Sequence, residues 1–167
     1  TTTQLALGDA LAIAIMKYKK FGKQDFKKLH PAGSLGAQLK TVEDIMITGN
    51  KIPFVNENMR TQNALRILSN KSLGILVVRN KNKKTIGIIT DGQVRRVSQK
   101  NENFQSLKVK EIMTKNPIFI DRNVLAAKAL TLMNNKKITS LLVCNKKKPT
   151  VTIGVIHVHN ILLSNIS

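Results

Sequence analysis

Hydrophobic and polar positions divide the chain into one apolar helix and two similar series of shorter elements. Residues 5–16 read LALGDALAIAIM, with threonines before them and lysines after them, a pattern typical of a helix. The apolar residues do not keep to one stripe, and a helix that is apolar nearly all round belongs in an interior. We therefore expect residues 1–40 to be the tail of a larger domain, in which this helix has further neighbours.

A duplicated unit follows this helix. VEDIM at 42–46 matches VKEIM at 109–113, and GIIT at 87–90 matches GVIH at 154–157, both at an offset of 67 residues. Between these motifs, residues 53–78 align with residues 118–143 at an offset of 65. Two-residue insertions or deletions confined to turns are typical of a duplicated fold.

Each unit predicts the order β-α-β-β-α, with opening strands at 52–55 and 117–120 and a lysine-rich turn between the later two strands. Because neither unit can cover its own sheet, we expect the two to pack together into one module of the α/β (α+β) class. The helix faces expected to be buried carry Met59, Ala64, Leu65 and Leu68 in the first unit and Leu125, Ala129, Leu132 and Met133 in the second.

Composition favours a soluble globular protein, since 42% of the 167 residues are apolar and 22% are charged. The single cysteine, Cys144, lies in the apolar run SLLVCN and is interpreted as a small buried hydrophobe. One cysteine cannot form an internal disulfide, so we expect a reducing, cytoplasmic compartment. The run at 5–16 is too short to span a membrane, and we expect no membrane partner.

The net charge of +19 raises the question of a nucleic-acid partner. The densest lysine runs, at 81–84 and 146–148, fall where surface turns are expected, and the chain has no Trp and one Tyr with which to stack bases. We therefore favour solvated turns, and a basic nucleic-acid-binding protein stays the lesser alternative.

The motif order resembles a known family. D/E-I-M at the start of each unit and GIITDG near the end of the first are similar to a tandem pair of CBS domains. TTTQLALGDALA, HPAGSLG at 30–36, VEDIM, TDGQVRR and GVIHVHNIL resemble, in this order, the C-terminal half of the D-arabinose 5-phosphate isomerases. The resemblance implies the end of a sugar-isomerase (SIS) domain at 1–40, a first CBS domain at 41–106 and a second at 107–167.

The resemblance also implies a reaction. The family interconverts D-ribulose 5-phosphate and D-arabinose 5-phosphate, a precursor of the Kdo sugar of lipopolysaccharide. His30 matches the family's active-site histidine, and an imidazole can move a proton near neutral pH. The other catalytic residues lie upstream in the family, so we expect this chain alone to be inactive, with no cofactor required.

CBS pairs hold nucleotides or similar anions between their units, and the resemblance places a binding site at the last strand of each unit. Thr90 takes the hydroxyl position, and Gln93 stands where the family has a ribose-binding Asp, with Asp91 adjacent. Arg95 and Arg96 fit either of two roles, attraction of an anion or an exposed face of the closing helix. His157 and Asn160 take the two positions in the second unit. The expected ligand is a regulatory small anion, a nucleotide or nucleotide-sugar.

His157 and His159 also raise the question of a metal site, with Cys144 on the neighbouring strand. If residues 157–165 form a helix, side chains two positions apart point to different faces, so no metal site is predicted. Self-association into a homodimer or homotetramer is expected, since the first helix carries apolar surface. A ligand-free structural or oligomerisation module remains the main alternative, because the ribose-binding carboxylate is missing.

Overall fold

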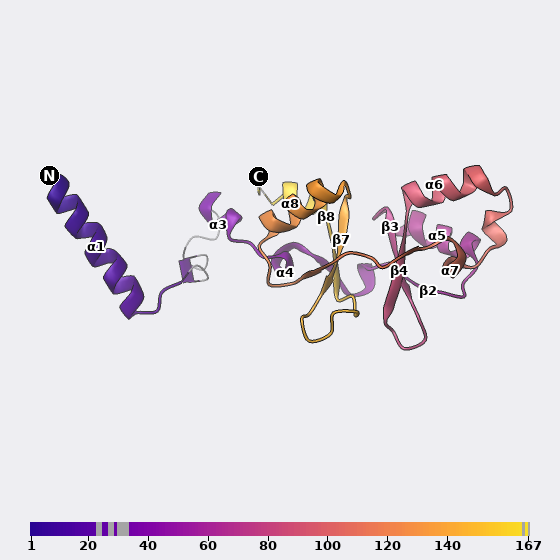
Figure 1. Ribbon diagram of the computed structural model, residues 1–167, viewed down its shortest axis with the longest axis horizontal. Coiled ribbons are helices and arrows are strands. Elements are labelled where there is room, and N and C mark those ends of the chain that lie inside the picture. Colours follow the sequence, from indigo (N-terminus) through magenta and orange to yellow (C-terminus); the bar gives the residue numbers. More distant parts are fainter. Residues whose placement is uncertain (23–24, 27–28, 30–33, 165, 167) are drawn as a thin grey trace.

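The computed structural model describes residues 1–22, 25–26, 29, 34–164 and 166. The first helix, α1 (Thr2–Tyr18), extends away from the rest of the molecule, and none of its residues is buried (Figure 1). Leu5 is 72% exposed and Leu11 55% exposed, so this chain leaves apolar surface of α1 uncovered. The predicted helix is confirmed. Within the described residues, no helix is long and apolar enough to cross a membrane.

Two four-stranded sheets form the body of the molecule. One sheet has the order β2 (Phe54–Asn56), β3 (Ile75–Arg79), β4 (Thr85–Thr90), β5 (Thr114–Lys115). The other has the order β1 (Ile47–Thr48), β8 (Gly154–His157), β7 (Ser140–Cys144), β6 (Phe119–Asp121). The longer helices beside the sheets are α5 (Thr61–Lys71), α6 (Asp91–Lys100) and α8 (Ala126–Lys136). The short helices are α3 (Ser34–Gln38), α4 (Val42–Ile45), α7 (Val109–Ile112), α9 (Val158–Leu162) and the 3₁₀ turns Gly49–Lys51 and Phe104–Ser106.

The predicted β-α-β-β-α order is confirmed in both units, with opening strands that begin two residues later than expected. In the first unit β2 begins at Phe54, because Pro53 has no N–H to donate and contributes only its carbonyl oxygen, which accepts from Val77 N at 3.0 Å. In both units the opening strand pairs in parallel with the strand that follows the long helix, and the next strand pairs antiparallel.

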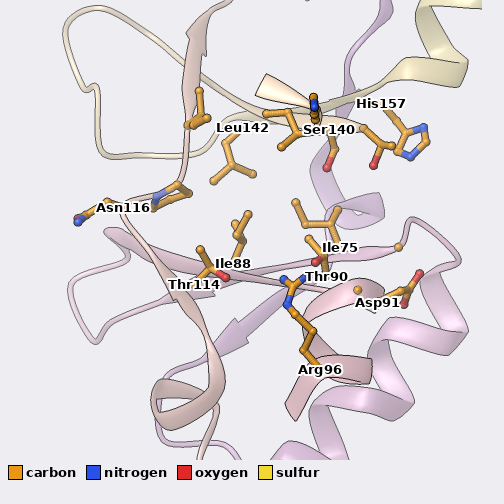
Figure 2. Close-up of a pocket in the computed structure, with 17 residues that line it drawn as sticks. Ile75, Ile88, Thr90, Asp91, Arg96, Thr114, Asn116, Ser140, Leu142 and His157 are labelled. Carbon is orange, nitrogen blue, oxygen red and sulfur yellow. The ribbon is translucent and has the colours of Figure 1, made fainter. Parts of the chain in front are cut away.

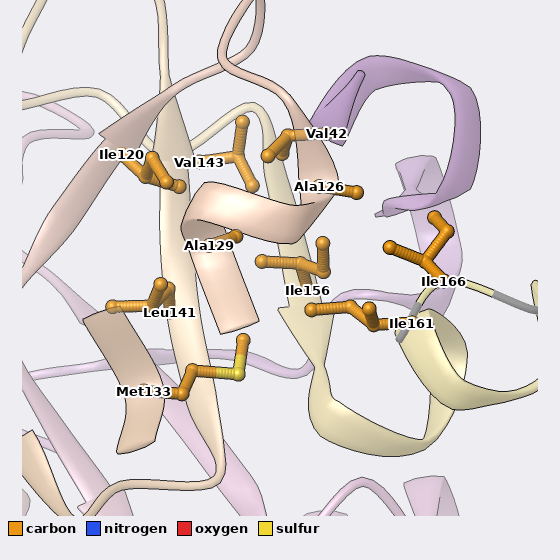
Figure 3. Packing of buried hydrophobic residues seen from close by; sticks show 10 residues of the cluster. All are labelled: Val42, Ile120, Ala126, Ala129, Met133, Leu141, Val143, Ile156, Ile161 and Ile166. Atoms are coloured by element: carbon orange, nitrogen blue, oxygen red, sulfur yellow. The ribbon is translucent and has the colours of Figure 1, made fainter. Parts of the chain in front are cut away.

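The two units exchange their opening segments, which the sequence analysis did not predict. Strand β1, from the first unit, pairs antiparallel with β8 of the second, and β5 pairs with β4 of the first. The short helices follow the same exchange. Val42 of α4 lies in the core of the second unit beside Ala126 and Ile156 (Figure 3), and Val109 of α7 lies in the core of the first.

Two glycines make room for this exchange. A Cβ at Gly87 of β4 would lie 2.6 Å from Met113 Sδ and 2.9 Å from the backbone oxygen of Thr114. A Cβ at Gly154 of β8 would lie 2.5 Å from Met46 Sδ. The methionines that end VEDIM and VKEIM therefore pack on the glycines that begin GVIH and GIIT, which gives these separate motifs one structural role.

A shared core joins the two units. Ile52, Ile75 and Val77 from the first unit cluster with Leu142 and Val155 from the second, all buried. The expectation that the units pack into one module is confirmed. Cys144 is also buried, as predicted.

The helix faces agree with the prediction in part. The buried residues of the two long helices are Thr61, Ala64 and Leu68 in α5 and Ala126, Ala129 and Met133 in α8. Met59 and Leu125 precede the helices, because α5 begins at Thr61 and α8 at Ala126.

Candidate functional site

A cleft of about 540 Å³ lies between the two units. The first unit lines it with the start of β3, the end of β4 and the first turns of α6, and the second with the segment around β5, the end of α8 and the start of β7. In Figure 2, Thr90 and Arg96 reach into the space from one side, and Ser140 and His157 face them from the other. The exchanged segment carries Thr114 and Asn116 into this cleft.

Thr90 ends β4 and begins α6. Burial alternates along the strand TIGIIT, and the polar Thr90 occupies the N-cap position of the helix. Its Oγ1 accepts a hydrogen bond from Gln93 N at 3.3 Å, a common way for a threonine to start a helix. The helix therefore points its N-terminus, with its partial positive charge, at the cleft.

Asp91 supplies a carboxylate that lines the cleft. Its backbone N donates to Gly74 O at 3.3 Å, and a Cβ at Gly74 would lie 3.0 Å from Asp91 Oδ2. Gly74 also has a φ of +63°, in the left-handed region that glycine adopts most readily. Because glycine has no side chain, Gly74 adopts this backbone conformation readily and leaves room for the Asp91 carboxylate.

Gln93 and Arg95 do not line the cleft, whereas Arg96 does. Gln93 Nε2 donates to Ile112 O at 3.1 Å, and its Oε1 accepts from Arg96 Nη2 at 2.8 Å. Gln93 therefore links α6 to α7 and holds the Arg96 side chain, and it does not line the cleft. Arg95 is exposed on another face of the helix.

His157 lines the cleft from the end of β8, and Asn160 does not. Asn160 Oδ1 accepts from His157 N at 3.2 Å, and His157 Nδ1 accepts from His159 N at 3.3 Å. Burial, and secondarily the charge of His159, lowers the pKa of His157. The neutral imidazole favoured by this shift keeps the Nδ1 lone pair that the bond to His159 requires.

His157 and His159 do not point to different faces of a helix, contrary to the sequence-based expectation. Helix α9 begins at Val158, so His157 is its N-cap, and the rings of His157 and His159 stack with centroids 5.0 Å apart instead of pointing to different faces. Cys144 lies at the far end of β7 from Ser140, the residue that pairs with His157. In the part of the chain that the structure describes, no third His, Cys, Asp or Glu joins these groups into a metal-binding cluster.

The second unit adds groups that the sequence analysis missed. Lys137 is the C-cap of α8, in the left-handed conformation with a φ of +53°, and it lines the cleft together with Thr139 and Ser140. A non-glycine residue in this conformation is uncommon and is often found where function requires it. Only the alignment of Lys137 with the C-cap Ser72 could have indicated its position from the sequence.

The lining has the chemistry of a binding site for an anion that also carries hydroxyl groups. Arg96 and Lys137 provide positive charge, Asp91 provides an acceptor, and the walls are apolar. The other polar side chains of the lining are Thr90, Thr114, Asn116, Thr139, Ser140 and His157, and the apolar ones are Ile75, Ile88, Pro117, Ile118, Ile138 and Leu142. His30, the expected catalytic residue, lies outside the described residues.

Comparison with known proteins agrees with this architecture. The CBS domain family matches residues 42–100 and 109–165. Arabinose 5-phosphate isomerase KdsD of Salmonella typhimurium (strain LT2) is 39% identical over 167 residues, which cover 99% of this chain and 50% of that protein. The chain thus spans about half the length of the curated relatives that it matches.

Solved structures share the fold. The CBS-domain protein ATU1752 from Agrobacterium tumefaciens has a TM-score of 0.69 at 16% identity, over 77% of this chain and 96% of that one. CBSX2, in a crystal structure with AMP, has a TM-score of 0.63 at 20% identity, over 74% of this chain and 94% of that one. On the matched segments, the paired sheets and the repeated motifs, this chain belongs to the CBS domain family, as a tandem pair of CBS domains.

Proposed function

We propose that this chain is the C-terminal regulatory part of an aldose-ketose isomerase that interconverts D-ribulose 5-phosphate and D-arabinose 5-phosphate. The observation that carries this proposal is the 39% identity over 167 residues to an arabinose 5-phosphate isomerase. The cleft between the units supports a regulatory role, because its lining suits the binding of an anion.

The catalytic residues belong, in this proposal, to a sugar-isomerase domain of which residues 1–40 are the end. The exposed apolar residues of α1 support this, since that domain would cover them. His30 moves a proton between carbons of the sugar phosphate, and the reaction needs no cofactor. Sugar phosphates are cytoplasmic metabolites, so we place the protein in the cytoplasm.

The test compares this chain with the longer isomerase. We expect the 167-residue chain to show no conversion of arabinose 5-phosphate. The longer protein should convert it and lose about 10²- to 10⁴-fold in rate on His30→Ala, the usual contribution of a general acid or base. A rate unchanged by that substitution would make His30 a structural residue.

The regulatory ligand, in this proposal, is a nucleotide-sugar from late in the pathway that arabinose 5-phosphate enters. The activated form of Kdo is a cytidine nucleotide-sugar with a phosphate and a carboxylate, and Arg96 and Lys137 suit such an anion. Calorimetry at physiological salt should give tighter binding of this compound than of AMP, and Thr90→Val should weaken it about fivefold or more. Equal or tighter binding of AMP would overturn the preference.

The exposed surface of α1 favours a second role in self-association, as a homodimer or homotetramer. Leu7, Ile13 and Ile15 are each more than half exposed in this chain. Light scattering of the chain should give a mass well above the 18.5 kDa of one copy. A mass of one copy at high concentration would count against assembly through this helix.

A further inference from the structure

Two lysine-rich turns lie on one edge of the module, which we call the basic edge. Exposed lysines stand in the turns that join β3 to β4 and β7 to β8: Lys81, Lys83, Lys84, Lys146, Lys147 and Lys148. In Figure 1 both turns extend from the same side of the molecule. The cleft lies at the opposite ends of these strands, beside the start of β3 and the end of β4, so the basic edge is a separate surface.

Hydrogen bonds between the two units hold the turns side by side. Thr85 N donates to Thr150 O at 2.9 Å, and the hydroxyls of Thr85 and Thr152 share a buried bond of 2.7 Å. Arg79 Nη2 donates to Thr152 O at 2.8 Å, and its guanidinium lies 3.1 Å from the centre of the Phe54 ring. Taken alone, each lysine run is typical of a solvated turn, but these contacts join the two runs into one surface.

Asparagine side chains fix the shape of both turns. Asn80 Oδ1 accepts from Asn82 N and from Lys84 N, each at 3.0 Å. In the second turn, Asn145 Oδ1 accepts from Lys147 N at 3.1 Å. Because the backbone that carries the lysines is already ordered, a partner does not have to order it on binding.

Acidic side chains neutralise little of the charge on the basic edge. Asp121 lies there, where its Oδ2 accepts from Lys146 N at 3.0 Å, and Glu57 follows β2 at the same edge. Glu43 pairs with Arg122 at 3.1 Å. Among the residues that the structure describes, none of the six turn lysines forms an ion pair. The basic edge therefore keeps an excess of positive charge that faces solvent.

The residue types of the basic edge fit a phosphodiester backbone better than a membrane or a protein. A peripheral membrane site places apolar side chains beside its lysines, and a protein interface has an apolar centre that is poor in lysine. The turns at 80–84 and 145–150 consist of Asn, Lys, Thr and one proline. Lysine and asparagine commonly bind the phosphate oxygens of nucleic acids, whereas stacking on single-stranded bases requires aromatic side chains, which these turns lack.

We propose that the basic edge binds the phosphate backbone of double-stranded nucleic acid, without preference for sequence. A duplex carries about one negative charge per 1.7 Å of its length, so lysines that stand next to one another meet several phosphates. Both turns contact the same duplex, because the bonds at Thr85 and Thr152 hold them together. This activity is separate from catalysis and from the ligand of the cleft.

Fluorescence anisotropy of the 167-residue chain with a labelled DNA duplex tests this binding. We expect micromolar affinity at about 50 mM salt and a steep loss of affinity at about 200 mM, because binding releases the counterions of the phosphates. A second duplex of different sequence should bind with an affinity within about twofold of the first, since phosphate contacts carry no sequence information.

Triple variants that each remove three charges locate the surface. The first-turn variant carries Lys81→Gln, Lys83→Gln and Lys84→Gln. The second-turn variant carries Lys146→Gln, Lys147→Gln and Lys148→Gln. The matched control removes three exposed lysines of α6 and α8 by Lys100→Gln, Lys128→Gln and Lys136→Gln. Thermal melts establish that each variant keeps the fold.

We expect each turn variant to weaken binding of the duplex about tenfold or more at low salt. The slope of log affinity against log salt should become shallower by about two to three, close to one for each phosphate contact that is lost. The control should change affinity less than about threefold, because salt screens charges that do not touch the duplex.

Equal weakening by the control and the turn variants would overturn the proposed surface, since net charge alone would then explain the attraction. Absence of duplex binding at low salt would overturn it as well. Binding of vesicles that contain anionic lipids, without binding of the duplex, would instead assign the basic edge to a membrane surface. None of these outcomes bears on the proposed isomerase function, because the assay contains neither a sugar phosphate nor a regulatory ligand.

Discussion

Replacing Gly87 by alanine tests whether the exchanged strands hold the module together. The new methyl group would lie 2.6 Å from Met113 Sδ and 2.9 Å from Thr114 O. The sulfur belongs to a flexible side chain that can move. The oxygen belongs to β5, whose residues Thr114 and Lys115 pair with Ile88 and Gly87. Relief of the contact therefore requires β5 to shift away from its partner strand.

Overpacking of this kind typically costs about 1–3 kcal/mol. For a chain of this size, each kcal/mol lowers the melting temperature by about 2–4 °C, so Gly87→Ala should lower it by about 4–8 °C for a 2 kcal/mol loss. Gly154→Ala should cost less, because its nearest backbone oxygen, that of Ile47, is 3.2 Å away.

Thermal and urea unfolding of these variants give the measurement. Gly8→Ala is the control, since nothing lies within 4 Å of a Cβ there, and alanine should stabilise the exposed helix by about 0.5–1 kcal/mol. The double variant Gly87→Ala with Met113→Ala should stay less stable than the wild type, because the clash with Thr114 O remains. Equal stability of the Gly87→Ala and wild-type proteins would refute the packing argument.

Three further predictions follow from buried groups. Thr85 Oγ1 and Thr152 Oγ1 share a buried hydrogen bond of 2.7 Å, so Thr85→Val should lower the free energy of unfolding in urea by about 1–3 kcal/mol. The double variant Thr85→Val with Thr152→Val should lose less than Thr85→Val alone, because neither hydroxyl is then left without a partner. A double variant that loses the sum of the two single losses would contradict this. Burial lowers the pKa of His157, so the unfolded chain binds a proton at this histidine more readily than the folded chain does. The free energy of unfolding should therefore fall as the pH drops below about 6.5, the ordinary pKa of histidine. His157→Gln should flatten this pH dependence, and an identical profile would exclude His157 as its source. Burial and the nearby Asp121 raise the pKa of the Cys144 thiol, so an alkylating reagent should react only on unfolding; rapid labelling of the folded chain would contradict the buried position.

The elements with a clear period could be predicted from the sequence, and the exchange between the units could not. Helices α5 and α8 show apolar positions at helical spacing, and their existence follows from it. Strands β1 and β5 have two residues each, too few to show a period. The segments that open the two units carry the same motif. The sequence pattern therefore does not decide whether each segment joins the sheet of its own unit or the sheet of the other unit. Long-range packing of Met46 and Met113 makes that choice.

The sequence predicted those residues of the candidate site whose place depends only on where they stand in a strand or helix. Thr90 and His157 end the last strand of each unit, and both line the cleft. Arg95 and Arg96 differ by one step along α6, and the phase of the helix, which packing determines, directs only Arg96 into the cleft. The sequence did not indicate Lys137. This residue reaches the cleft because it ends α8 in the left-handed backbone conformation, which a lysine rarely adopts.

We propose that a ligand in the cleft between the CBS units controls a sugar-phosphate isomerase. The most direct test of this control is the rate of arabinose 5-phosphate conversion by the longer protein, measured with and without the cytidine nucleotide-sugar. We expect the ligand to change the rate of the wild-type protein severalfold, and Arg96→Ala, but not Arg95→Ala, to reduce that response. A rate independent of the ligand, or an Arg96→Ala protein that responds like the wild type, would contradict control of the isomerase through this cleft.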